Sequence, residues 1–170
     1  MGSEMCIRDR STANKNLSIV GAVPNAKEAW SIAIVKAEWN EEITNGLFEG
    51  VKALLEESDI PAANVHVFEV PGSFELPLGA QWAIEEREVD AVICLGSVIR
   101  GETAHFDYVC QAVSMGIKDV SLAYNLPVIF GVLTDDNIEQ SRARSGGKYG
   151  NKGTEAAATA LKMLELRDKL

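Results

Sequence analysis

Short apolar runs alternate along this chain with longer segments in which apolar residues recur at helical spacing. The runs are typical of strands whose two faces are both covered, and the recurrent spacing is typical of helices packed on a core. Predicted strands cover residues 31–36, 64–70, 90–98 and 126–133. One predicted helix begins after Asn40, and the others cover residues 74–88, 105–119, 137–144 and 148–167.

Turn and capping residues indicate where these elements begin and end. Asn40 is a residue type that caps helices, and apolar residues follow it on one helical face. Pro-Gly at 71–72 closes the second strand, so Pro77 must lie in the first turn of the following helix. Ser-Gly-Gly at 145–147 separates the last two helices.

The alternation of strand and helix predicts an α/β fold with parallel strands. We expect a three-layer αβα, flavodoxin-like architecture, in which a four-stranded parallel sheet is flanked by helices on both faces. In such folds ligands bind beyond the carboxyl ends of the strands. The loops 39–40, 71–75 and 96–105 follow the first three strands and are expected to meet there.

The N-terminal residues are set apart from this pattern. Residues 1–10, MGSEMCIRDR, fit no secondary-structure period and are too charged for a signal peptide. They resemble translated sequencing-adapter sequence more than native protein, so residues 1–14 are expected to be a non-native or disordered leader. Residues 15–170 are expected to form a single domain that buries a core without disulfides.

Composition narrows the classes of partner. The net charge of −9 disfavours nucleic acid and anionic membranes and leaves small molecules or proteins. The sequence contains no apolar stretch long enough to span a bilayer. Cys6, Cys94 and Cys110 form no C-x-x-C pair, and His66 and His105 show no metal-ligand spacing. We therefore expect a reduced, cytoplasmic protein without a metal site.

The segment after the third strand carries the candidate chemistry. Gly101 and Thr103 allow close approach of an anion and hydrogen bonds to it, and amides at a helix start favour negative charge. His105 stands at the predicted helix start, and an imidazole gives and accepts protons near neutral pH. The alternative is an ordinary strand-to-helix turn with a surface histidine, since such short patterns recur by chance.

A run of bases without an intervening acid follows the fourth strand. Its members are Arg142, Arg144, Lys148 and Lys152. In an otherwise acidic chain this cluster is a candidate counter-charge for a bound anion. The alternative is a solvated face with bases near a helix end.

Four ordered segments resemble the lumazine synthase family. They are VPGSFELPLGA at 70–80, LGSVIRGETAHFDYVC at 95–110, PVIFGVLT at 127–134 and GNKGTEAA at 150–157. The resemblance implies condensation of 5-amino-6-(D-ribitylamino)uracil with 3,4-dihydroxy-2-butanone 4-phosphate. The products would be 6,7-dimethyl-8-ribityllumazine, phosphate and water, in the penultimate step of riboflavin biosynthesis. No cofactor is implied.

The resemblance also implies roles for individual residues. His105 matches the general acid and base of the family, and Arg144 is the predicted phosphate anchor, because a guanidinium binds phosphate in a fork that lysine cannot reproduce. The pyrimidine and its ribityl chain are expected to meet Trp39, Ser73, Phe74, Glu75, Ser97, Val98, Ile99 and Phe130. The phosphate substrate is expected to meet Gly101, Glu102, Thr103 and Arg144, with support from Lys152 and Glu155.

Several of these residues have a simpler structural interpretation. Trp39 stands where the family usually carries a phenylalanine that stacks on the heterocycle, but an aromatic ring there also caps cores. Glu75 suits sugar hydroxyls, but a carboxylate also favours a helix start. Glu102 is expected to turn its carboxylate away from the phosphate, and Lys152 either assists or pairs with Glu155 one turn on.

The resemblance extends to assembly. Family members form pentamers, and Phe130 and Arg144 are expected to complete the site of a neighbouring subunit. An icosahedral shell of pentamers and association with riboflavin synthase are further expectations. Two alternatives stay open: a flavin- or lumazine-binding shell without catalysis, which would bind ligands without forming product, and a flavodoxin-like phosphate-binding module, which would be a monomer.

Overall fold

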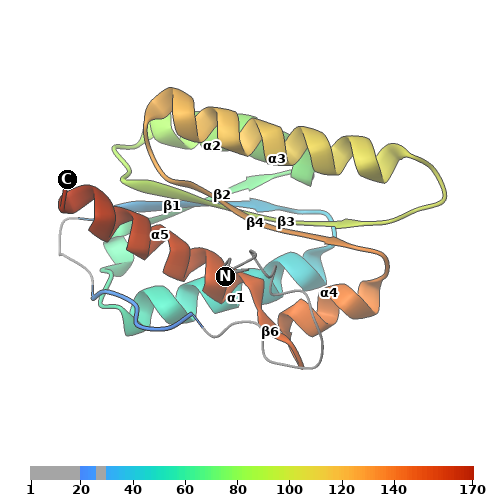
Figure 1. Ribbon diagram of the computed structural model, residues 1–170, viewed down its shortest axis with the longest axis horizontal. Helices are drawn as coiled ribbons and strands as arrows, with labels where there is room; N and C mark the ends of the chain where they lie inside the picture. The colour runs from blue at the N-terminus through green and yellow to red at the C-terminus, as the bar shows by residue number, and fades with distance from the viewer. Residues whose placement is uncertain (1–19, 26–29) are drawn as a thin grey trace, which may run out of the picture.

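The protein has one central parallel sheet. The computed structural model describes residues 20–25 and 30–170, so the expected leader at 1–14 lies outside the described residues. The strands of the sheet are β1 (Ile32–Ala37), β2 (Val65–Val70), β3 (Ala91–Ile99) and β4 (Val128–Asp135). They are hydrogen-bonded in the order β2-β1-β3-β4 (Figure 1). The predicted four-stranded parallel sheet is confirmed.

Helices cover both faces of this sheet. They are α1 (Glu41–Glu57), α2 (Leu76–Glu86), α3 (His105–Tyr124), α4 (Ile138–Arg144) and α5 (Lys152–Asp168). The pair α2 and α3 lies on one face, and α1, α4 and α5 lie on the other (Figure 1). The three-layer, flavodoxin-like architecture is therefore confirmed. No helix in the described part of the chain is both long and apolar enough to cross a bilayer.

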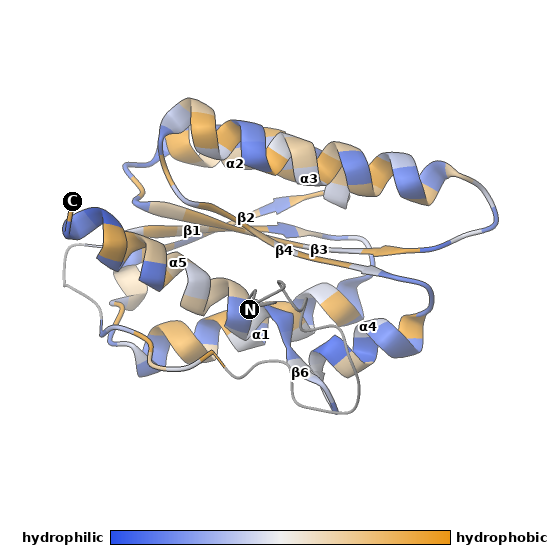
Figure 2. Cartoon of the chain, viewed as in Figure 1, coloured by the Kyte–Doolittle hydropathy of each residue, from blue (hydrophilic) through white to orange (hydrophobic). Residues whose placement is uncertain are grey.

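Alternation along the strands divides the core between the two helical layers. In β1, Ile32 and Ile34 pack with α1 and α5, whereas Ala33 and Val35 pack with α2 and α3. All four are fully buried, as expected for a strand with both faces covered. Figure 2 shows the sheet as an apolar band between helices that are more polar outside.

The register of the sheet brings the carboxyl ends of the strands to one edge. Ala37 at the end of β1 pairs with Val70 at the end of β2, and Ile99 at the end of β3 pairs with Asp135 at the end of β4. The loops that follow β1, β2 and β3 therefore leave the sheet side by side. Pro77 lies in the first turn of α2, as expected, after a short 3₁₀ helix at Ser73–Glu75.

The sequence pattern missed a small hairpin between α4 and α5. Its strands are β5 (Ser145–Gly147) and β6 (Gly150–Asn151), which pair antiparallel. Gly146 and Gly150 have φ values of 109° and 90°, where side chains are strained. The prediction that a helix begins at 148 was therefore wrong: Asn151 caps α5 by accepting a hydrogen bond from the Gly153 amide at 2.8 Å.

Helix α1 begins after Asn40 as predicted, but its capping differs from prediction, and so does the end of α3. Asn40 precedes α1, but its side chain makes no capping bond and its backbone is left-handed, with φ 59°. Its Nδ2 instead donates to the Ser97 carbonyl at 2.9 Å, which links the loop after β1 to β3. Helix α3 continues beyond 119 to Tyr124 and ends at Asn125, which is also left-handed.

Candidate functional site

A cavity of about 610 Å³ opens where the loops after β1, β2 and β3 meet. We call it the groove. It is lined by Trp39, Asn40, Ser73, Phe74, Glu75, Ser97, Val98, Ile99, Gly101, Thr103, His105, Phe106, Tyr108 and Val109. The predicted meeting of three loops at one edge is confirmed. Most residues expected to meet the pyrimidine lie in this groove. So do Gly101 and Thr103 of the segment 101–103, which we call the anion turn because it is expected to bind an anion.

The loop after β1 presents Trp39 to the groove on a fixed backbone. The Trp39 amide donates to the Pro71 carbonyl at 3.0 Å, and the Glu38 amide donates to the Val70 carbonyl at 2.8 Å. The Trp39 side chain is nevertheless 66 % exposed. It does not cap the core, so the simpler interpretation of this residue is wrong, and a flat ligand can reach the indole.

The turn after β2 is stabilised by one of its own candidate residues. Glu75 accepts a hydrogen bond from the Gly72 amide through Oε2 at 3.0 Å. The carboxylate thus supports the start of the helical segment, which was the simpler interpretation of Glu75. Because Glu75 also lines the groove, this structural role does not remove it from the site.

The end of β3 forms part of the groove wall. Ser97 is 4 % exposed, and its Oγ has no hydrogen-bond partner among the described residues. Its carbonyl oxygen accepts from Asn40. Sequence reasoning placed Asn40 in one of the three converging loops and gave it a role as a helix cap, but did not single it out as a site residue. Its position directly after Trp39 was the available signal.

The anion turn between β3 and α3 is open to solvent. Gly101, Glu102 and Thr103 are all exposed, and Glu102 is not among the groove-lining residues, in line with the expectation that its carboxylate turns away. A Cβ placed on Gly101 would meet nothing within 4 Å. The described protein atoms therefore leave room for a side chain at this position, and the space in front of Gly101 is free for a ligand.

His105 is the first residue of α3, and it is exposed at the rim of the groove. Its amide donates to Thr103 Oγ1 at 3.4 Å, which ties the anion turn to the helix start. The positive end of the helix dipole also lies here. The imidazole can therefore exchange protons with a ligand held between this turn and the groove.

Arg100, which sequence reasoning did not single out, is engaged beside the anion turn. It donates to Asp136 at 2.9 Å and to Asp107 at 3.4 Å, and its guanidinium lies over the Phe106 ring. The hydrogen bond to Asp136 is the main reason that the pKa of Arg100 is raised. Arg100 does not line the groove, so a phosphate at the turn needs its counter-charge from elsewhere.

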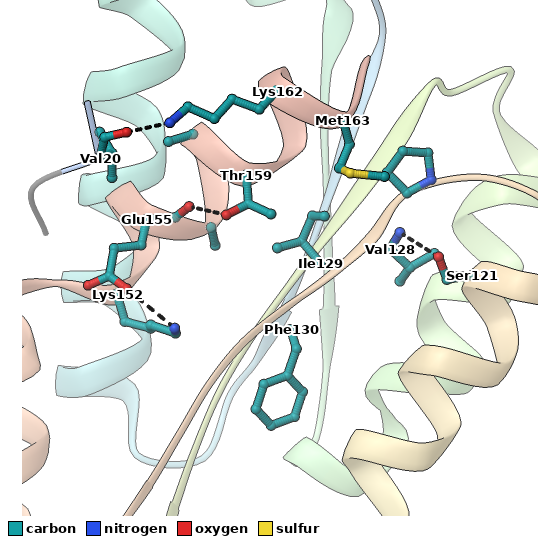
Figure 3. Close-up of a pocket in the computed structure, with 13 residues that line it drawn as sticks. Val20, Ser121, Val128, Ile129, Phe130, Lys152, Glu155, Thr159, Lys162 and Met163 are labelled. Carbon is teal, nitrogen blue, oxygen red and sulfur yellow. Dashed lines mark hydrogen bonds and ion pairs between the residues drawn. The ribbon is translucent and has the colours of Figure 1, made fainter. Parts of the chain in front are cut away.

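The remaining candidates lie away from the groove. Phe130, Lys152 and Glu155 line a second cavity of about 620 Å³. We call it the lateral cavity; its other lining residues are Val20, Ser121, Pro127, Val128, Ile129, Ala156, Ala158, Thr159, Lys162 and Met163. Figure 3 shows Phe130 on β4 and the paired Lys152 and Glu155 on α5. The two cavities share no lining residue.

Arg144 lies near this second group of residues. Its Nη2 is 3.0 Å from Glu155 Oε1, and its Nη1 donates to the Tyr149 carbonyl at 3.2 Å. Its side chain is 17 % exposed. Lys152 Nζ is 3.4 Å from Glu155 Oε2, so the predicted pairing of these two residues is confirmed.

The rest of the predicted basic cluster does not stay together. Arg142 makes a two-pronged contact with Glu42 on α1, at 2.8 and 3.0 Å. Lys148 lies over the Tyr149 ring. For Arg142, the interpretation as a base on a solvated face is therefore correct, and Arg144 is the arginine of the cluster that points toward the lateral cavity residues.

Asp135 is an acidic group near Arg144 that the sequence pattern did not reveal. Burial raises the pKa of its carboxyl, although Ser141 donates to it at 2.7 Å and Arg144 acts in the opposite direction. Among residues 20–25 and 30–170, no group of three or more histidine, cysteine or acidic side chains is arranged to hold a metal ion.

Comparison with known proteins gives one consistent family. The sequence model described as 6,7-dimethyl-8-ribityllumazine synthase matches residues 29–168. The protein of that name from Cytophaga hutchinsonii is 59 % identical over 155 residues, which cover 91 % of this chain and 97 % of that protein. Those from Christiangramia forsetii and Flavobacterium johnsoniae are 52 % and 50 % identical, covering 92 % and 94 % of this chain and 95 % and 84 % of their own.

Proposed function

Because this chain belongs to the 6,7-dimethyl-8-ribityllumazine synthase family, it is an enzyme of riboflavin biosynthesis, and we propose that its reaction takes place in the groove. The reaction condenses 5-amino-6-(D-ribitylamino)uracil with 3,4-dihydroxy-2-butanone 4-phosphate. The observation that carries the proposal is the meeting of three strand-end loops around one cavity, with His105 on its rim.

The pyrimidine is proposed to stack on Trp39. The indole is exposed, aromatic and held on a fixed backbone, as a stacking platform requires. The carboxyl end of β3, at Ser97, Val98 and Ile99, offers backbone groups to the pyrimidine edge. The ribityl chain is proposed to face Ser73, Phe74 and Glu75. The pyrimidine therefore lies across the carboxyl edge of the sheet.

The phosphate substrate is proposed to sit at the anion turn. Amides at the start of α3, the Thr103 hydroxyl and the free space before Gly101 suit a phosphate group. The chemistry is imine formation between the pyrimidine amine and the ketone, loss of phosphate, and ring closure by the ribitylamino nitrogen. His105 at the rim would give and accept the protons that these steps move.

The site is proposed to be completed by a second copy of the chain. The lateral cavity carries Phe130 and lies close to Arg144, and neither residue lines the groove of its own chain. A neighbour that placed its lateral cavity over the groove would supply an aromatic ring and a guanidinium. The phosphate would then gain the counter-charge that Arg100 does not provide.

Assembly and location complete the proposal. We expect a homopentamer with sites between subunits, packing of pentamers into an icosahedral shell, and association with riboflavin synthase. The free thiols of Cys94 and Cys110 agree with a cytoplasmic, reducing environment. Sedimentation of the purified protein separates a monomer, a pentamer and a shell directly.

The direct test supplies both substrates to the purified protein and follows lumazine formation by absorbance and fluorescence, together with released phosphate. We expect product and phosphate in equal amounts. His105→Ala should lower turnover about a hundredfold while changing pyrimidine binding little. Pyrimidine binding without product in the unaltered protein would instead favour a non-catalytic binding shell.

A further inference from the structure

Gly72, in the turn after β2, lies directly against the six-membered ring of Trp39. A Cβ added at Gly72 would stand 2.5 Å from Trp39 Cε3 and 2.6 Å from Cζ3. Such distances are far shorter than a van der Waals contact. The indole therefore occupies the volume that the side chain of any other residue at position 72 would need.

The backbone at this position does not explain the glycine. Gly72 has φ −136° and ψ 176°, an extended conformation that any residue but proline adopts. Its amide donates to Glu75, a bond that any residue but proline could make. What glycine provides here is the close approach of the indole and, to a smaller extent, of Glu75 Oε2, which would lie 3.1 Å from the added Cβ.

The position of the indole depends on this contact because the rest of Trp39 is already fixed. Its amide is bonded to Pro71, and the next residue, Asn40, is bonded to Ser97. The ring itself is 66 % exposed and so has few other restraints. Trp39 lines the groove whereas Gly72 does not, so the ring stands between Gly72 and the cavity.

We infer that Gly72 is a positioning residue for the pyrimidine, because its missing side chain lets the Trp39 indole lie back and leaves the groove wide enough for the heterocycle. The inference rests on the proposed stacking of the pyrimidine on Trp39. In Gly72→Ala the Cβ would push the ring into the groove. The exposed ring can move, so the fold should persist.

A double-mutant cycle tests this coupling. The unaltered protein, Gly72→Ala, Trp39→Phe and the double variant are titrated with 6,7-dimethyl-8-ribityllumazine, and the KM of each substrate is measured. Gly72→Ala should weaken lumazine binding and raise the pyrimidine KM about tenfold, with the phosphate-substrate KM changed less than about twofold. In the Trp39→Phe background, which lacks the two atoms that the Cβ would strike, the same change should cost less than about twofold.

Control variants separate the possible failures. Trp82→Phe makes the same replacement at an exposed tryptophan on α2 outside the groove and should leave binding unchanged. Equal losses from Gly72→Ala in both backgrounds, or no loss in either, would overturn the inference. Unchanged pyrimidine binding in Trp39→Ala would overturn the stacking itself and with it the inference. If Gly72→Ala alone fails to fold, folding of the double variant would support the steric contact, and its failure would overturn it.

Discussion

At the residue scale, the surroundings of Gly101 and Cys94 determine how far each position tolerates substitution. Gly101 faces open space at the anion turn, and Cys94 is enclosed in the sheet. The first residue is free to change as far as folding is concerned, and the second is not. Gly101 therefore allows a test of function at unchanged stability, and Cys94 allows a test of stability alone.

Gly101→Ala should reduce phosphate binding without unfolding the protein. The added methyl meets no protein atom but enters the space proposed for the phosphate. We expect the free energy of unfolding to stay within about 0.5 kcal/mol of the unaltered protein. The KM for the phosphate substrate should rise about tenfold, a loss of roughly 1.4 kcal/mol in binding. Urea unfolding and steady-state kinetics measure the two quantities, and an unchanged KM would remove the anion turn from the site.

Cys94 should make stability fall at alkaline pH. Burial raises the pKa of its thiol to about 12 from an ordinary value of 9.0. Because the folded pKa is the higher one, the folded state holds its proton longer, and the stability from Cys94 is complete below pH 9.0 and is lost as pH rises toward 12. The slope is about 1.4 kcal/mol per pH unit.

Urea unfolding from pH 8 to pH 11 of the unaltered protein and of Cys94→Ala checks this expectation. The variant starts from a lower stability because it leaves a cavity, but its curve should lack this slope. Matching slopes in the two proteins would mean that the pKa of Cys94 is the same in the folded and unfolded states. Cys110→Ala is the matched control: burial also raises the pKa of this thiol, but Cys110 is only partly buried, so this variant should keep most of the slope.

At the scale of elements, the β5–β6 hairpin and the start of α5 hold Arg144 and Glu155 in place. Asn151 Nδ2 donates to the Gly46 carbonyl of α1 at 2.7 Å, and a Cβ added at Gly153 would lie 1.9 Å from the Leu47 carbonyl oxygen. Helices α1 and α5 are thus in backbone contact at this point. A small change here should move the whole segment.

Gly153→Ala should destabilise the protein by about 2–3 kcal/mol or more, because neither backbone can yield without breaking hydrogen bonds. The KM for the phosphate substrate should rise as well, since Arg144 is displaced. Thermal or urea unfolding measures the first effect. Gly101→Ala is the matched glycine control, and equal stabilities of the two variants would contradict the backbone contact between α1 and α5.

The elements that could be predicted are those with enough length to carry a pattern. The apolar run of β3 and the helical periodicity of α1 identify them without any neighbour. The β5–β6 hairpin is too short for a period, and its geometry depends on left-handed glycines and on α1, which is distant in sequence. Groove residues could be predicted because they follow strand ends. The bond from Asn40 to Ser97 and the pairing of Arg100 could not, because they join separate elements.

At the scale of the whole molecule, the candidate residues are divided between two surfaces. The groove holds Trp39 and His105, and the lateral cavity holds Phe130 with Arg144 nearby. A contact that joins two different surfaces of identical chains is heterologous, and such contacts close into rings when the rotation permits. In a ring of copies, every groove would therefore face the lateral cavity of a neighbouring copy.

Mixing two inactive variants tests this division. His105→Ala damages the groove and leaves Phe130 and Arg144 intact, whereas Arg144→Ala leaves the groove intact and removes the guanidinium near the lateral cavity. When equal amounts are refolded together, about a quarter of the interfaces should combine two intact halves. We expect about that fraction of normal activity, measured as lumazine formation, although each variant alone is nearly inactive. Activity no greater than the sum of the separate variants would contradict a site shared between copies.

The contacts of Arg144 also bear on the thermodynamics of phosphate binding. Its guanidinium is already paired with Glu155 and bonded to the Tyr149 carbonyl. A free arginine side chain would lose up to about 2 kcal/mol of conformational entropy when immobilised. Here folding has largely fixed the side chain before a ligand arrives, so the proposed binding of phosphate by Arg144 should be enthalpic in character, with little conformational entropy left to lose.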